Sequence, residues 1–200
     1  MNSTLTVTTA ATDTTLLNIA VARGVLGIDG RGQDAALQAY IARASDVIAR
    51  RCKRVFGSET VSEQFRLDTL QEELILNRYP VTGTPTVVEN GITLTASTDY
   101  EADKAKGWIT RLYNDRPCWW PICKVTVSYT AGYTLPTGAP QALQQACLQL
   151  VRAYFFASDR DPAVRSDSVH DVADITYRDI EHLPHDVSGL LVPFRNLRAV

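Results

Sequence analysis

The longest amphipathic pattern in the chain lies between residues 33 and 56. Its apolar positions recur every three or four residues and form one stripe, made of Leu37, Tyr40, Ile41, Ala44, Ile48, Cys52, Val55 and Phe56. This spacing predicts an α-helix with one buried face. Asp34 in the first turn and basic residues in the last turns complement the helix dipole, and Gly57 can supply the left-handed residue that ends the helix.

A shorter helix is predicted before it, from residue 13 onward. Asp13 or Thr14 can cap its first turn, and Gly24 and Gly27 mark its end. The segment that follows, residues 28–32, is typical of a turn between two helices.

A second long helix is predicted at residues 140–158, because Pro140 suits a first turn and apolar residues follow at helical spacing. Three apolar residues, Leu148, Phe155 and Phe156, lie outside the main stripe. A helix with more than one apolar face is either sandwiched within its own fold or shared with a neighbouring subunit.

Residues 60–130 change to the alternating pattern of β-strands. Val125, Val127 and Tyr129 fall on one face of such a strand, and Asn90-Gly91 has the composition of a two-residue hairpin turn. The predicted fold class is therefore α+β, a helical bundle with an inserted small antiparallel β-sheet and an extended C-terminal tail.

The chain is expected to have three parts: a flexible N-terminal arm at 1–12, a core at 13–165 and a C-terminal docking tail at 166–200. Within the core, helices are expected within 13–57 and at 140–158, with the β insertion at 60–130 between them. The arm is rich in Thr and has no amphipathic period, so it is expected to be loose or to form an edge strand.

The 200 residues include 20 Lys and Arg against 22 Asp and Glu, which gives a formal charge of -2. This balance lacks the electrostatic footprint of a dedicated nucleic-acid binder. Four basic residues nevertheless crowd the end of the long helix: Arg50, Arg51, Lys53 and Arg54. They invite a DNA-binding interpretation, although dipole compensation on a solvated helix end is the commoner role.

No apolar run approaches the roughly 18 residues of a membrane span, and the first residues lack the pattern of a signal peptide. We therefore expect a protein that is made and kept in the cytoplasm, with its four cysteines reduced. The three tryptophans, Trp108, Trp119 and Trp120, are expected to supply buried area in the core or at a subunit interface.

Candidate chemistry is sparse. His182 and His185 stand three residues apart among carboxylates (Asp171, Asp174, Asp179, Glu181 and Asp186), but Pro184 disfavours one continuous helix and no third ligand has a defined spacing. No cysteine lies in a redox or nucleophile motif, and no phosphate-binding glycine loop is present. We expect no enzyme activity, no catalytic residue, no metal and no cofactor.

Four segments are distinctive in combination: QDAALQAYIARASDVIARRC, LILNRYPVTGTPTVVENG, DYEADKAKGWI and WWPICKVTVSYTAGYTLPTGAPQALQQACLQLVRAYF. In this order and spacing the sequence resembles the head-tail connector, or adaptor, family of long-tailed bacteriophages, which includes the adaptor of gene transfer agents. The similarity runs from about Leu16 to Phe194. Its most specific element is the strand VTVSYTAGY, followed by prolines and the helix that begins at Gln141.

The resemblance implies a structural protein of the virion neck that forms a ring, usually of twelve copies, between the portal and the stopper or tail-completion proteins. Genomic DNA would pass through the ring during packaging and ejection, with transient non-specific contact. The protein would assemble in the host cytoplasm and contact no membrane.

The resemblance also suggests roles for three groups of residues. The tail residues Leu190, Leu191, Val192, Pro193, Phe194 and Arg195 would dock on the portal, although an apolar tail more often packs on its own helices. The second long helix would contribute Leu148, Phe155 and Phe156 to a subunit interface. The basic cluster of Arg50, Arg51, Lys53 and Arg54 would face the lumen or the DNA.

Two functions of other classes remain open on the residues alone. One is a small intracellular metal-dependent enzyme that uses His182, His185 and nearby carboxylates. The other is a DNA-binding accessory protein that uses the basic cluster at the end of the long helix.

Overall fold

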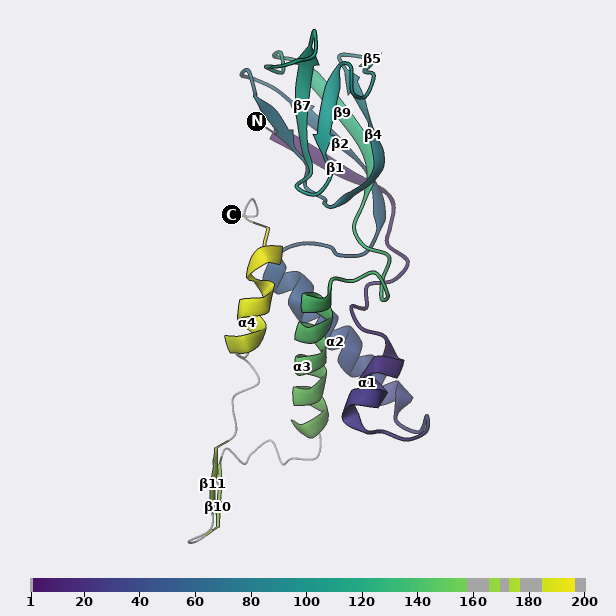
Figure 1. Cartoon of the computed structure of the whole chain (residues 1–200), viewed down its shortest axis with the longest axis vertical. Coiled ribbons are helices and arrows are strands. Elements are labelled where there is room, and N and C mark those ends of the chain that lie inside the picture. Colours follow the sequence, from purple (N-terminus) through teal and green to yellow (C-terminus); the bar gives the residue numbers. More distant parts are fainter. Residues whose placement is uncertain (1, 158–165, 170–172, 177–184, 197–200) are drawn as a thin grey trace. The chain divides into compact units, whose positions relative to one another are not determined.

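The computed structural model describes residues 2–157, 166–169, 173–176 and 185–196 (Figure 1). The chain divides into two compact units. The sheet unit contains the described residues up to Thr14 and Val55–Leu135. The helical unit contains Thr15–Arg54 and the described residues from Pro136 onward.

The described helices of the helical unit are α1 (Ile19–Leu26), α2 (Asp34–Cys52), α3 (Gln141–Ala157), α4 (His185–Leu191) and the 3-10 turn η1 (Val192–Phe194). A separate two-stranded sheet joins β10 (Ser166–Val169) to β11 (Ala173–Thr176). The buried core residues of this unit include Leu16, which precedes α1, and these residues of α2, α3 and α4: Leu37, Ile41, Ala44, Ile48, Leu143, Ala146, Cys147, Val151, Val187 and Leu191. This core confirms the stripes predicted for the two long helices.

The start of α1 and the end of α2 differ from the prediction. The cap of α1 is Asn18, whose side chain accepts a hydrogen bond from the backbone of Ala20 at 2.9 Å, rather than Asp13 or Thr14. The residue that ends α2 is Lys53, at φ 52°, rather than Gly57. Val55 and Phe56 therefore leave the helix and belong to the sheet unit.

The sheet unit contains two antiparallel sheets. The larger has the order β1 (Asn2–Thr9), β2 (Glu59–Arg66), β9 (Lys124–Ala131), β4 (Val81–Glu89) and β5 (Ile92–Thr93). The smaller has the order β3 (Glu73–Ile75), β7 (Trp108–Tyr113) and β6 (Tyr100–Asp103), with β8 (Arg116–Cys118) also pairing with β7.

Residues from both sheets share one core around the fully buried Trp120, with Val61, Phe65, Leu74, Val87, Tyr100, Ile109, Val125 and Val127. The α+β class is thus confirmed. The predicted helical bundle with a small inserted sheet underestimates the size of the β-structure. The nine described strands of the sheet unit enclose a hydrophobic core of their own.

The N-terminal residues form an edge strand rather than a flexible arm. β1 pairs with β2 from Asn2 opposite Arg66 to Val7 opposite Val61. The β-branched threonines and the half-buried Leu5 favour this pairing, because such residues pack well on a pleated surface. The predicted domain boundary after residue 12 therefore separates residues of one unit.

Two glycines lie against each other where the chain enters and leaves the sheet unit. A side-chain carbon built on Gly132 would lie 2.3 Å from the carbonyl oxygen of Gly57, and one built on Gly57 would lie 2.6 Å from the carbonyl oxygen of Asp13. We call Gly57 and Gly132 the glycine clamp. Only glycine permits so close an approach of the backbones.

Candidate interaction surfaces

The described residues contain no group of three or more His, Cys, Asp and Glu side chains that could hold a metal ion. His182 lies outside the described residues, and His185 is described only as the first residue of α4. The four cysteines are unpaired thiols. Burial raises the pKa of Cys52 and raises the pKa of Cys147 to about 11, so both thiols stay protonated at neutral pH and are poor nucleophiles.

Among the described residues, no helix is both long enough and apolar enough to cross a membrane.

The exposed side of α3 carries the three residues predicted for a subunit interface. Leu148 and Phe155 are half-buried, and Phe156 is 59% exposed. The rings of Phe155 and Phe156 meet edge to face with centroids 5.5 Å apart. Leu148 and Phe155 are seven residues apart and thus lie on one side of the helix, two turns apart.

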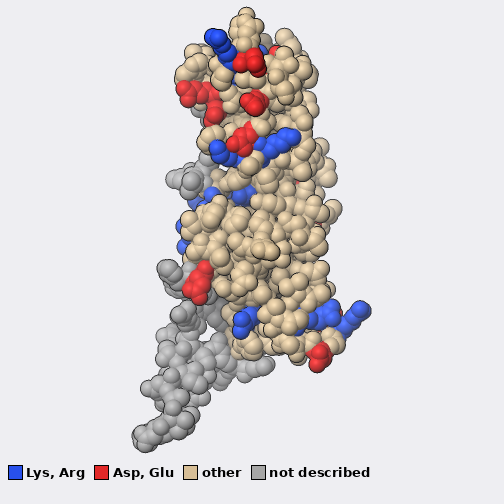
Figure 2. All heavy atoms as spheres, in the orientation of Figure 1, with Lys and Arg blue, Asp and Glu red and all other residues tan. Residues whose placement is uncertain are grey.

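Leu148 also borders a shallow groove between α1 and α3, with a volume of about 400 Å³. Its apolar residues are Leu17, Val21, Ala142 and Leu148, and its polar residues are the uncharged Gln141, Gln144 and Gln145. On the face shown in Figure 2, charged side chains lie around the margin of a broad uncharged area over the helical unit. An uncharged surface with exposed aromatic residues is typical of a protein–protein contact.

The basic cluster divides into exposed and buried members. Arg50, Arg51 and Lys53 are exposed, and Arg50 pairs with Asp46 at 2.7 Å within α2. Arg54 is only 7% exposed and belongs to the core of the helical unit, so the prediction that it faces a lumen or DNA is wrong. Arg50, Arg51 and Lys53 lie in or directly after the last turn of α2, where cations complement the helix dipole, and their contact with a lumen or DNA stays a prediction.

The tail packs on its own helical unit. Val187 and Leu191 of α4 are fully buried, and the backbone N–H of Asn196 donates to the carbonyl oxygen of Cys52 at 2.8 Å. Leu191 therefore cannot dock on a partner, because its side chain is already part of the chain's own core. Of the other predicted docking residues, Val192 and Pro193 are exposed, while Leu190, Phe194 and Arg195 are half-buried.

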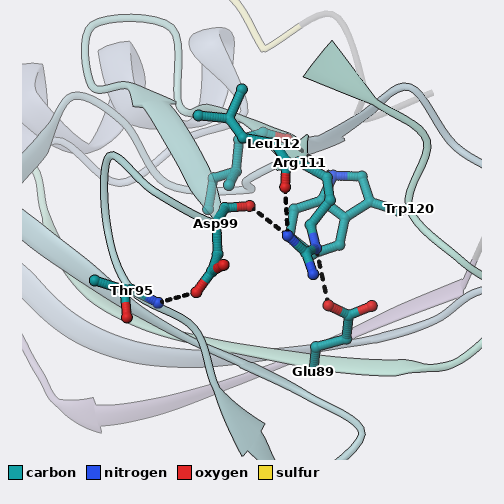
Figure 3. Close-up of polar contacts among 7 residues, drawn as sticks. Glu89, Thr95, Asp99, Arg111, Leu112 and Trp120 are labelled. Atoms are coloured by element: carbon teal, nitrogen blue, oxygen red, sulfur yellow. Dashed lines mark hydrogen bonds and ion pairs between the residues drawn. The ribbon is translucent and has the colours of Figure 1, made fainter. Parts of the chain in front are cut away.

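An arginine that no sequence motif marks joins the two sheets. Arg111 of β7 donates from Nε to the Glu89 carboxylate at 2.9 Å and from one terminal nitrogen to the carbonyl oxygens of Asp99 and Leu112, at 2.7 and 2.6 Å (Figure 3). Its guanidinium carbon lies 6.0 Å from the centre of the Trp120 ring. Because Glu89 is on β4 of the larger sheet, this ion pair ties the two sheets together.

A second polar network surrounds Glu63, which is fully buried. Its carboxylate accepts hydrogen bonds from the backbone N–H of Asn77 at 3.0 Å, from the Asn77 side-chain amide, and from the Tyr129 hydroxyl at 2.9 Å. Burial, helped by the Glu63 charge, raises the pKa of Tyr129 well above its usual value. Nearby, Glu59 forms an ion pair with Arg78. These contacts anchor the chain between β3 and β4.

The alternating pattern of β2 contains a signal for the burial of Glu63 that the sequence-based predictions missed. In β2 the buried positions are 59, 61, 63 and 65, so a strict period of two places Glu63 between the core residues Val61 and Phe65. Arg111 has no comparable signal, because its partners come from distant segments of the chain.

The fold and its surfaces define an α+β protein of two units that presents uncharged and basic faces suited to contacts with other macromolecules. This chain belongs to the head completion protein family, whose sequence model, described as "Head completion protein", matches residues 15–197. It is thus a structural virion protein, and the family resemblance predicted from the sequence is confirmed.

Solved structures with the same fold come from particles called gene transfer agents (GTA). The chain titled "Neck of empty GTA particle computed with C6 symmetry" is 21% identical, with a TM-score of 0.57 over 98% of this chain and 97% of that one. A chain from the neck of the native GTA particle with C12 symmetry gives 21% and 0.54, and one from the virion of the native GTA particle gives 24% and 0.54, with the same coverage. No curated protein matches this chain.

Proposed function

We propose that this protein is the head-tail connector of a virion neck, a ring through whose centre DNA passes, placed between the portal and the stopper or tail-completion proteins. The observation that carries the proposal is the family match over residues 15–197 together with a neck fold that covers 98% of the chain. The ring would act during genome packaging and DNA ejection. The protein would assemble in the host cytoplasm and remain in the virion without enzymatic activity or a cofactor.

The ring proposal is supported by the C6 and C12 symmetry of the similar necks. A ring of identical copies needs a heterologous contact, in which two different surfaces of the chain meet. The stripe of Leu148, Phe155 and Phe156 is a suitable surface, because it adjoins the uncharged groove between α1 and α3. Twelve copies are the expected number.

The basic end of α2 is the candidate lumen surface. Arg50, Arg51 and Lys53 are exposed and could contact passing DNA briefly. Non-specific phosphate contacts of this kind weaken steeply with salt, so a few cations can guide a duplex without holding it.

The exposed end of the tail is the candidate portal contact. Val192 is 61% exposed next to the exposed Pro193, and Leu190 and Phe194 offer further apolar surface. Because Leu191 and Asn196 fix the segment to the helical unit, this surface is preorganised, which lowers the entropic cost of docking.

The test is ring formation by the full chain and a Phe156→Asp variant, by electron microscopy and light scattering, with and without the candidate portal. Phe156 is 59% exposed, so the charge should leave the fold intact and weaken ring formation by desolvating a carboxylate in the contact. Ile92→Asp is the matched control, because Ile92 is 70% exposed on β5 in the other unit. Normal rings with Phe156→Asp would contradict the α3 interface. A wild-type chain that never forms rings would contradict the connector itself.

A further inference from the structure

One tryptophan of the smaller sheet already holds a cation of its own chain. The Lys106 ammonium lies 5.0 Å from the centre of the Trp108 ring and 3.4 Å from a carboxylate oxygen of Asp103. Hydrogen bonds from the backbone of Lys106 and Ala105 help lower the pKa of Asp103. Trp108 and Asp103 are paired residues on β7 and β6, so one sheet face positions both the ring and the carboxylate. A ring beside a carboxylate is a favourable site for a basic side chain.

A second tryptophan, Trp119, directly follows β8 of this sheet, and no cation of the described residues is seen over its ring. Trp119 is 54% exposed and borders a cleft of about 260 Å³ with Glu72, Glu73, Thr110, Pro117 and Cys118. We call this the Trp119 cleft. No ion pair of the described residues engages Glu72 or Glu73. The cleft therefore offers an aromatic wall and two uncompensated carboxylates.

The backbone around the cleft is fixed. Gln71 and Trp120 exchange backbone hydrogen bonds of 2.7 and 3.4 Å, which holds the segment before β3 against the segment after β8. Trp120, next in sequence to Trp119, is fully buried with its indole N–H donating to Ile109 at 3.2 Å. Glu73 stands opposite Thr110 in the ladder between β3 and β7. A preformed site of this kind binds without a large ordering cost.

Two exposed apolar residues lie close in sequence to the residues that line the cleft. Leu70 is 56% exposed and Ile122 is 64% exposed, and the bridge between Gln71 and Trp120 brings their segments together. Exposed apolar residues around a charged centre are typical of a protein contact, because they exclude water when a partner covers them.

The charge distribution within the chain identifies the partner. The sheet unit has seven Lys and Arg against eleven Asp and Glu, a formal charge of -4. Residues 15–54 and 136–157 of the helical unit have eight Lys and Arg against three Asp, a formal charge of +5. Residues 158–200 carry a formal charge of -3, so the whole helical unit has a charge of +2. Neighbouring copies in a ring therefore attract when the sheet unit of one meets the helical unit of the next.

We propose that the Trp119 cleft binds the exposed arginines Arg50 and Arg51 of α2 from a second copy of this chain. An arginine side chain fits this chemistry, because its planar guanidinium stacks on an indole while it donates to carboxylates. The contact is heterologous, joining a cleft in one copy to a helix end in the next, as a closed ring requires. This inference rests on the proposed ring and names a surface that completes it. Where it holds, Arg50 and Arg51 belong to the subunit contact rather than to the lumen, and Lys53 is the candidate lumen cation of the exposed cluster.

The experiment is a charge exchange on the full chain, with self-association measured by sedimentation velocity at low and high salt. The three variants are Glu72→Lys with Glu73→Lys, Arg50→Glu with Arg51→Glu, and all four changes together. Each pair of changes should weaken association about tenfold or more, and the combined variant should recover most of it. Trp119→Ala should weaken association at both salt concentrations, whereas the charge terms should fade at high salt. The control Glu101→Lys with Asp115→Lys changes the charge of the same unit by the same amount at exposed positions outside the cleft.

The outcomes separate the cleft from the ring. If Glu72→Lys with Glu73→Lys leaves association unchanged while Phe156→Asp abolishes it, the ring stands and the cleft proposal is wrong. If the acidic pair matters but the arginine pair does not, the cleft contacts a different surface of the second copy, and the assignment of Arg50 and Arg51 as its occupants is wrong. A loss equal to that of the control would show only a general charge effect and would also overturn the proposal.

Discussion

The glycine clamp gives the sharpest test of the fold, through the single change Gly132→Ala. Gly132 has φ +112°, a conformation that alanine adopts only with strain. The added methyl group would lie 2.3 Å from the carbonyl oxygen of Gly57, 2.7 Å from its carbonyl carbon and 3.0 Å from the carbonyl oxygen of Phe56. All three are backbone atoms, so no side-chain rotation can relieve the overlap.

The magnitude follows from two contributions. A non-glycine residue in this region of backbone space costs about 1–2 kcal/mol. Separating the two segments also disturbs the backbone hydrogen bonds from Tyr133 to Phe56 at 2.8 Å and from Ser58 to Tyr133 at 3.0 Å, each worth about 1 kcal/mol. The free energy of unfolding of the sheet unit should therefore fall by about 3–4 kcal/mol, a large share of the roughly 5–15 kcal/mol typical of a domain.

The assay can follow the sheet unit alone, because Trp108, Trp119 and Trp120 are the three tryptophans of the chain and all belong to it. Urea unfolding monitored by tryptophan fluorescence should show a lower midpoint for Gly132→Ala. Gly83→Ala is the control, since Gly83 has φ +74° but no atom within 4 Å of the added carbon, and it should lose only about 1 kcal/mol. Equal losses in the two variants would refute the role of close approach.

Two further predictions concern buried polar groups. Burial raises the pKa of Cys147 from 9.0 to about 11, so the folded state keeps its full stability below pH 9 and loses up to about 3 kcal/mol as the pH rises to 11 and the thiol ionises. Cys147→Ala lacks this thiol, so its melting temperature should fall less steeply over this pH range than that of the wild type. Glu63→Gln should lower the free energy of unfolding by about 1–3 kcal/mol in urea titrations, because an amide turns a donor toward Asn77 or Tyr129, while the exposed Glu101→Gln should have no measurable effect.

Local patterns predicted the helices well and their ends poorly. The stripe of α2 is visible because each of its buried residues contributes to one face at helical spacing. Its end was misplaced because the first plausible glycine, Gly57, is needed for the close approach to Gly132, and Lys53 adopts the left-handed conformation instead. Because Gly132 is 75 positions from Gly57, the sequence around Gly57 does not show that this glycine is needed for the close approach.

The sheets show the same division between local and distant information. The turn at Asn90-Gly91 was predicted correctly, because the positive φ values of 46° and 87° are what this pair tolerates. The edge position of β1 and the joining of two sheets by Arg111 depend on pairing between segments far apart in sequence. Similarly, Trp120 is buried while its neighbour Trp119 is exposed, which the composition of the segment does not distinguish.

The net charge of the chain was the least informative property of the sequence, for a physical reason. The total of -2 combines -4 in the sheet unit with +5 in residues 15–54 and 136–157 and -3 in residues 158–200. Interactions between exposed charges decay within about 10 Å at ordinary ionic strength, so a partner senses the charge of the unit it touches rather than the total. A near-neutral chain can therefore carry both halves of an electrostatic contact. In a closed ring each copy would present the acidic Trp119 cleft to one neighbour and the basic end of α2 to the other, so weakening either surface alone should impair assembly as much as weakening its counterpart.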